Sequence, residues 1–199
     1  MFSAVARRVL FLILLGSATQ VCADTVTPNE VVPVVDGKVL SRIAVIKGQE
    51  DASTIQYVAQ DETFADWSRL VVYSNIRSEE VGNDPKVLGL RLIAALQQFS
   101  PGAKYKIAGT EDGNTVLLDF LSWPQSKSHL EFSVYRIEKG DEGKGVYSVQ
   151  MSARLPFYTE ITDEVKQTLQ VTRASLMQQI SSFNMVKVKE LMDTQAETK

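Results

Sequence analysis

Residues 130–155 read LEFSVYRIEKGDEGKGVYSVQMSARL, and this stretch decides the fold. From Leu130 to Ile137, apolar side chains alternate with more polar ones until the period slips at the end, which is typical of a strand. Residues 139–145 are charged and rich in glycine, which is typical of a turn. Residues 146–155 are again mostly apolar. The stretch therefore predicts a hairpin of two antiparallel strands.

Other segments of strand and helix character lie on both sides of this hairpin. Apolar runs of strand length occupy residues 38–48, 55–59, 70–74, 105–108 and 115–122. Two longer segments instead repeat apolar residues at helical spacing, and each begins with a capping residue. Asp84-Pro85 opens the first, which ends at Pro101-Gly102, and Thr162 opens the second, which runs to Phe183. For Met185 to Leu191 the pattern allows a final edge strand or a continued helix.

The order of these elements predicts the fold class. The strands cluster along the chain and are joined by short polar turns, whereas a parallel sheet would alternate strands with helices. We therefore expect an α+β domain, in which an antiparallel sheet of about six to seven strands has two long helices packed on it. Residues 38–192 are predicted to form this single domain, followed by a polar tail at 193–199.

The first 23 residues have the order of a secretory signal peptide. Arg7 and Arg8 precede an apolar run, and the small residues that end at Ala23 precede Asp24. We therefore predict cleavage between Ala23 and Asp24. The apolar run is short for a span, which needs ~20 apolar residues, so an uncleaved membrane anchor is the weaker alternative.

Two further alternatives concern the same segment. Cleavage after Ala18 would leave a slightly longer chain, and acylation of Cys22 would make the protein a lipoprotein with a membrane anchor. Gln20 and Val21 depart from the residues that usually precede an acylated cysteine. After cleavage at Ala23 the chain begins with a proline-containing lead-in, 24–37, which we expect to be extended and flexible.

Composition excludes several kinds of function. The sequence has 21 basic and 24 acidic residues, so there is no basic excess to hold the phosphates of a nucleic acid. Its single cysteine leaves with the signal peptide, so a cysteine nucleophile, a disulfide and a cysteine-containing zinc site are all excluded from the mature chain. No phosphate-binding glycine loop is recognisable. We expect no cofactor and no metal.

Few residues remain as candidates for catalysis. His129 is the only histidine and lies in a polar loop, so we interpret it as solvated, with pairing to Ser126 or Ser128 as the alternative. Asp119 lies within the apolar residues 116–121. Alternation favours a solvated face for Asp119, whereas burial would make it a candidate functional acid. The other acidic pairs fit turns or helix caps.

Aromatic residues are the remaining signal. Phe64 and Trp67 are three residues apart, which predicts that they lie on one side of a helical turn. Trp123 ends a strand beside a turn, where a surface tryptophan would indicate an interaction site. We therefore take Trp123, Trp67 and Phe64 as the candidate interaction surface, with burial in the core as the alternative for Trp67.

Residues Asp61 to Val71, DETFADWSRLV, resemble a segment shared by a group of uncharacterised exported bacterial proteins. The order of the elements also resembles the Mog1/PsbP-like α/β sandwich. That resemblance implies an antiparallel sheet between helices. It supplies no catalytic or binding residue.

These observations favour a non-catalytic periplasmic protein of the bacterial envelope. We expect a binding, assembly or accessory module with an envelope protein as its partner, and an extracellular location is the alternative address. Two other functions remain open. One is a carboxylate-dependent hydrolase that acts on envelope glycans, and the other is a carrier of an apolar small molecule.

Overall fold

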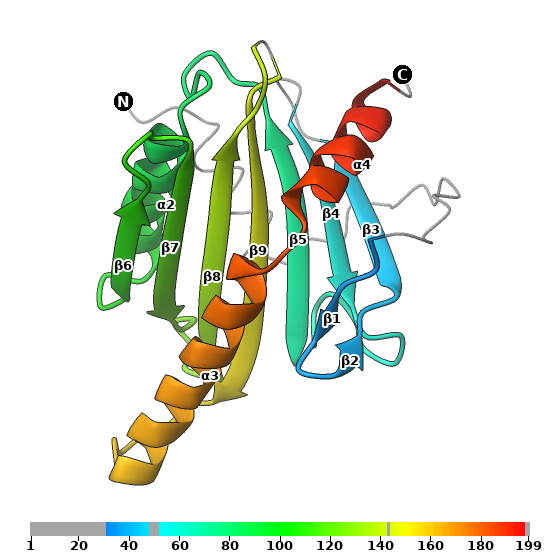
Figure 1. The fold of residues 1–199 in the computed structure, drawn as a ribbon. Helices are drawn as coiled ribbons and strands as arrows, with labels where there is room; N and C mark the ends of the chain where they lie inside the picture. The colour runs from blue at the N-terminus through cyan, green and yellow to red at the C-terminus, as the bar shows by residue number, and fades with distance from the viewer. Residues whose placement is uncertain (1–30, 48–51, 143, 198–199) are drawn as a thin grey trace.

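The computed structural model describes residues 31–47, 52–142 and 144–197. The predicted signal peptide, its cleavage site at Ala23–Asp24, and Cys22 lie outside these ranges. Seven strands form one antiparallel sheet in the order β3-β4-β5-β9-β8-β7-β6 (Figure 1). The strands are β3 (Arg42–Lys47), β4 (Ser53–Val58), β5 (Arg69–Ile76), β6 (Lys104–Gly109), β7 (Thr115–Ser122), β8 (His129–Lys139) and β9 (Val146–Pro156).

The hairpin predicted from residues 130–155 is confirmed. It forms β8 and β9 at the centre of the sheet, in a register that runs from Leu130 opposite Leu155 to Lys139 opposite Val146. Every other predicted strand is also present, although the run at 38–48 is divided between two strands. The strand clustering therefore indicated the antiparallel sheet correctly.

Three helices accompany the sheet in the described part of the chain: α2 (Pro85–Phe99), α3 (Asp163–Ser181) and α4 (Met185–Glu197). The two predicted long helices are α2 and α3, capped by Asp84 and Thr162 as expected. Residues from Met185 form a separate helix and not an edge strand. Because α4 runs to Glu197, the residues predicted as a polar tail begin inside a helix.

The helices cover both faces of the sheet (Figure 1). Alternate residues of β7, such as Leu118 and Phe120, share a core cluster with Leu92 and Leu96 of α2. We call this side the α2 face. On the other side, the α3/α4 face, residues such as Tyr73 and Met151 pack with Leu176, Ile180, Val188 and Met192. Inner strands such as β8, with Val134 in one cluster and Tyr135 in the other, therefore present buried residues in both directions.

Part of the predicted lead-in is folded. Residues 34–39 form a small hairpin of β1 (Val34–Val35) and β2 (Lys38–Val39), which turns at Asp36-Gly37. Both turn residues have positive φ, 49° and 79°, as Asp-Gly hairpin turns require. The Asp36 carboxylate accepts hydrogen bonds from Arg69 Nε (2.7 Å) and Ser175 Oγ (2.7 Å), which hold the turn against α3. Residues 34–37 of the predicted lead-in are therefore part of a hairpin.

Candidate functional site

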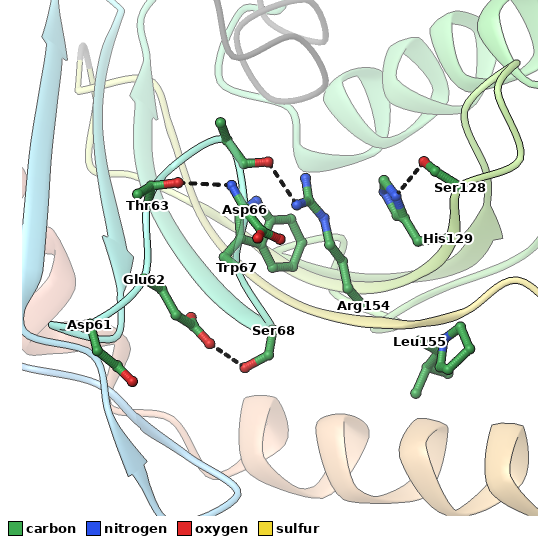
Figure 2. A pocket seen from close by; sticks show the side chains of 12 residues that line it. Asp61, Glu62, Thr63, Asp66, Trp67, Ser68, Ser128, His129, Arg154 and Leu155 are labelled. Atoms are coloured by element: carbon green, nitrogen blue, oxygen red, sulfur yellow. Dashed lines mark hydrogen bonds between the residues drawn. The ribbon is translucent and has the colours of Figure 1, made fainter.

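A crevice of about 780 Å³ opens at the end of the sheet where β8 begins and β9 ends (Figure 2). One wall is the loop that joins β4 to β5. The other wall comes from the start of β8 and the end of β9. Its lining residues are Asp61, Glu62, Thr63, Ala65, Asp66, Trp67, Ser68, Ser128, His129, Arg154, Leu155 and Pro156.

The loop wall is a tight reversal and not a helical turn. The backbone N–H of Thr63 donates to the carbonyl of Asp66 (3.0 Å), and the N–H of Asp66 donates back to the carbonyl of Thr63 (3.2 Å). Thr63 Oγ1 also accepts from the Asp66 N–H (3.0 Å). These paired bonds close the loop on itself, so the helical turn predicted for Phe64 and Trp67 does not form.

Glu62 anchors the base of this loop. Its carboxylate accepts from Ser68 Oγ (2.5 Å) and from Lys38 Nζ (3.2 Å), and its carbonyl accepts from Arg42 Nη1 (3.0 Å). Burial raises the pKa of Glu62, but the hydrogen bonds from Ser68 and Lys38 outweigh it and leave the pKa below its ordinary value. Glu62 is therefore a charged structural anchor for the crevice wall.

Arg154 and Trp67 form the rigid centre of the crevice. The guanidinium carbon of Arg154 lies 4.1 Å from the centroid of the Trp67 ring, which is a cation–π contact. Arg154 Nη1 also donates to the Ala65 carbonyl (2.9 Å). The ring itself is only 5% exposed and packs with Val58, Leu70 and Val72 on its other side. The planar cation is thus fixed between the core and the crevice.

His129 lies beside Arg154 as the first residue of β8, and it is half-buried and not fully solvated (Figure 2). Its Nδ1 is 3.0 Å from Ser128 Oγ. Burial lowers the pKa of His129, and the charge of Arg154 lowers it further, while Asp66 acts in the opposite direction. The imidazole is therefore mainly neutral at pH 7, and its second nitrogen has no hydrogen-bond partner among the described residues.

A buried acid lies next to the crevice. Glu131 pairs with Arg154 across the β8–β9 ladder and is 5% exposed. Burial raises its pKa to about 7, although Arg154 and a hydrogen bond from Ser133 act to lower it. Alternation along β8 placed Glu131 among the polar residues, and so the sequence did not indicate that Glu131 is buried. The sequence contains no signal that this side of the strand is also buried.

The structure does not bring the three predicted interaction residues together. Trp67 lines the crevice. Phe64 packs against the core cluster that contains Trp67, but it does not line the crevice. Trp123 packs over Gly102 at the end of α2, where a Cβ atom on the glycine would lie 3.0 Å from the tryptophan ring. Arg154, which contacts the Trp67 ring in the structure, was not among the residues that the sequence indicated.

Asp119 is buried, at 7% exposure, where alternation favoured a solvated face. The difference arises because α3 crosses this part of the sheet. Arg173 of α3 donates to the Asp119 carboxylate from Nε (3.1 Å) and Nη2 (2.6 Å). The hydrolase hypothesis requires a second carboxylate beside Asp119. The side chain that contacts the Asp119 carboxylate is instead the guanidinium group of Arg173.

None of the helices in residues 31–47, 52–142 and 144–197 is both long and apolar enough to cross a bilayer. In the same ranges, no group of three or more histidine, cysteine, aspartate and glutamate side chains is arranged to hold a metal ion.

A model of an uncharacterised protein family matches residues 47–185, which is more than two thirds of the chain. The chain belongs to this family. The matched range contains the whole loop wall of the crevice, as well as His129, Glu131 and Arg154. Searches of the curated proteins and of the solved structures found no match to this chain.

Proposed function

We propose that the protein is a non-catalytic module of the bacterial envelope that binds a partner protein through the crevice. The observation that carries the proposal is the Arg154 guanidinium, held on the Trp67 ring and tethered to the Ala65 carbonyl at an open surface. Arginine and tryptophan dominate the energetics of protein interfaces. A side chain that is already immobilised loses little conformational entropy when a partner binds.

The lining of the crevice suits a peptide-like partner. Arg154 offers a cation, and Asp61 and Asp66 offer exposed carboxylates in the same crevice. Leu155 and Pro156 add apolar surface at the opposite wall. A polypeptide presents both hydrogen-bonding and apolar groups over such a short distance, whereas a purely apolar small molecule would leave the charged groups without partners. This supports a protein partner over an apolar cargo.

Site-specific photo-crosslinking in the producing cells tests this proposal. A photoreactive residue at Ala65, an exposed position in the crevice, is compared with the same residue at Ala174, an exposed position on α3. We expect one covalent adduct of defined mass from position 65 and none from position 174. The substitution Arg154→Lys keeps the charge but loses the planar contact with Trp67, and should abolish the adduct. Equal adducts at both positions, or none at position 65, would refute a binding role for the crevice.

We also propose that the protein is exported to the periplasm, with cleavage between Ala23 and Asp24. The mass and N-terminal sequence of the protein from fractionated cells test this. A chain that starts at Asp24 in the periplasmic fraction supports the proposal. An acylated chain that starts at Cys22 would instead identify a lipoprotein. An uncleaved chain in the cytosol would contradict export.

We also propose that the fold is related to the Mog1/PsbP-like sandwich. The basis of this proposal is that helices cover both faces of one antiparallel sheet, with α2 on one side and α3 and α4 on the other. A solved structure of another member of this family would test it.

A further inference from the structure

The strand β6 forms one edge of the seven-stranded sheet. Among the described residues it pairs only with β7, and all six of its residues are exposed. An edge strand presents a row of backbone N–H and C=O groups that a further strand can use. At the usual rise per residue, this edge is about 20 Å long.

The side of β6 on the α2 face is apolar. Tyr105 and Ile107 lie opposite Phe120 and Leu118, which belong to the core beneath α2. Tyr105 is 40% exposed, Ile107 is 36% exposed, and Leu90 of α2 is 51% exposed. A cavity of about 610 Å³ lies beside Leu90 and Ile107, between the start of α2 and the β6–β7 turn. Apolar side chains of an added strand would fill this space.

The other side of β6 is basic. Lys104 and Lys106 alternate with the apolar pair, and so they lie on the α3/α4 face. Lys106 lies opposite Asp119 in the β6–β7 register. The Asp119 carboxylate forms its ion pair with Arg173. Within the described ranges, neither lysine forms an ion pair. An added strand would therefore meet two unpaired cations on this side.

We propose that β6 accepts an extended segment of a partner protein in which apolar and acidic side chains alternate. The added strand completes the backbone hydrogen bonds of the edge, as in other cases of strand addition. Its apolar side chains contact Leu90, Tyr105 and Ile107, and its acidic side chains contact Lys104 and Lys106. Cross-strand pairs of opposite charge and of apolar residues both stabilise such a ladder.

Charge decides the identity and the orientation of the occupant. In a second copy of this chain, pairing β6 with β6 would bring lysines close to lysines on one side of the ladder, which is unfavourable. The cavity on the α2 face is lined by charges of both signs, Asp84, Glu111 and Asp112 with Lys86 and Lys139. The charged side chains of β6 itself are Lys104 and Lys106, so they direct the acidic side chains of the partner to the α3/α4 face.

This surface goes beyond the function proposed above, since none of its residues lines the crevice. An NMR titration of the ¹⁵N-labelled protein, in the form that its host produces, tests it with three synthetic peptides. The first alternates valine and glutamate, the second alternates valine and lysine, and the third has the composition of the first in two blocks. We expect amide shifts at residues 104–109 and near Leu90 with the first peptide only.

Charge reversal gives the matched variants. The substitution Lys106→Glu should weaken binding of the valine–glutamate peptide by roughly fivefold or more, and should create binding of the valine–lysine peptide. The substitution Lys127→Glu, at an exposed lysine outside β6, should change neither affinity.

Three results would overturn the proposal. The first is the absence of binding by the valine–glutamate peptide. The second is equal binding of the valine–lysine or the block peptide. The third is self-association of the free protein that Lys106→Glu alters, because a second copy would then be the occupant of the edge.

Discussion

Glu131 is an acid enclosed by the sheet. Its carboxyl group accepts a hydrogen bond from Ser133 Oγ (3.3 Å), and Ser133 in turn contacts Ser152 Oγ (2.7 Å) on β9. The nearest cation across the ladder, Arg154, is committed to Trp67 and to the Ala65 carbonyl. The charged form of Glu131 is therefore poorly compensated, which is why its pKa rises to about 7.

This raised pKa makes stability depend on pH in a definite direction. The ordinary pKa of the group is 4.5. Between pH 4.5 and about 7 the folded protein keeps a proton that the unfolded chain has lost, so stability falls as the pH rises through this window. Glu131→Gln should remove the effect. We expect urea unfolding to show the variant more stable than the parent at pH 8, by on the order of 2–3 kcal/mol, and similar to it at pH 4.5.

Glu111→Gln, in the exposed β6–β7 turn, is the control for this experiment. It removes a carboxylate without a buried environment, so its stability should follow that of the parent across the whole range. If Glu131→Gln and the parent lose stability in parallel between pH 4.5 and 8, the carboxyl group of Glu131 is not the cause of the pH dependence.

Elements with a repeating side-chain pattern were predictable from the sequence. Strands such as β7 and β9 follow from apolar runs bounded by turns, and α2 and α3 follow from their caps and apolar stripes. The apolar stripe of α3 is buried only at Leu176 and Ile180, because the first half of the helix extends past the ends of the strands (Figure 1). Spacing identifies the helix, whereas its neighbours determine how much of the stripe is buried.

The candidate site was less predictable, because it depends on contacts between distant segments. Trp67 and Arg154 are 87 residues apart and meet only after β5 and β9 pair. The loop wall is shaped by hydrogen bonds between Thr63 and Asp66, which the spacing of the aromatic residues does not reveal. The burial of Asp119 and Glu131 likewise follows from the packing of both faces of the sheet, which alternation along one strand cannot indicate.

The turn between β8 and β9 yields a prediction at the scale of an element. Gly145 has φ +76°, and a Cβ atom there would lie 2.3 Å from the Ile76 carbonyl oxygen. Gly113, in the β6–β7 turn, has φ +71° but open space around it. Both glycines therefore favour the left-handed region, and only Gly145 is also sterically confined. We expect Gly145→Ala to cost more than Gly113→Ala, for which the backbone strain alone is about 1 kcal/mol.

Thermal and urea unfolding of the two alanine variants measure this difference. Gly113→Ala isolates the backbone cost, and the excess in Gly145→Ala, about 2 kcal/mol or more, reports the steric conflict with β5. Equal losses of stability would mean that the hairpin end moves away from Ile76 at little cost, and that the close approach is not required for the central strands to pair.

At the scale of the whole molecule, the C-terminal helix closes the α3/α4 face. Val188 and Met192 of α4 are fully buried in the main core cluster. Asp193, one residue further, accepts a hydrogen bond from the Tyr147 hydroxyl and forms ion pairs with Lys144 (2.9 Å) and Arg77 (3.2 Å). These contacts join α4 to β9, to the β8–β9 turn and to the end of β5. The helix end is therefore attached to the centre of the sheet.

Asp193→Asn tests this attachment. Burial raises the pKa of Asp193, but hydrogen bonds from Tyr147 and Lys144 outweigh it and leave the pKa below 3.8. A depressed pKa in the folded state contributes stability above the unfolded value, which is lost as the pH falls through the folded value. We expect the variant to be less stable than the parent by about 1 kcal/mol at pH 7, with the difference decreasing as the pH falls through the lowered pKa of the folded state.

Urea unfolding at pH 7 and pH 3 measures the effect, with Asp61→Asn as the control at an exposed carboxylate of the crevice. Hydrogen exchange shows which part of the molecule loses stability. Amides of α4 should exchange faster in Asp193→Asn, whereas the exchange of amides in α2, on the opposite face, should not change. A uniform increase across the molecule would mean that α4 unfolds together with the rest of the domain. Unchanged stability at pH 7 would mean that the apolar contacts of Val188 and Met192 hold the helix without Asp193, and that residues from 193 onward behave as the dispensable tail that their composition predicts.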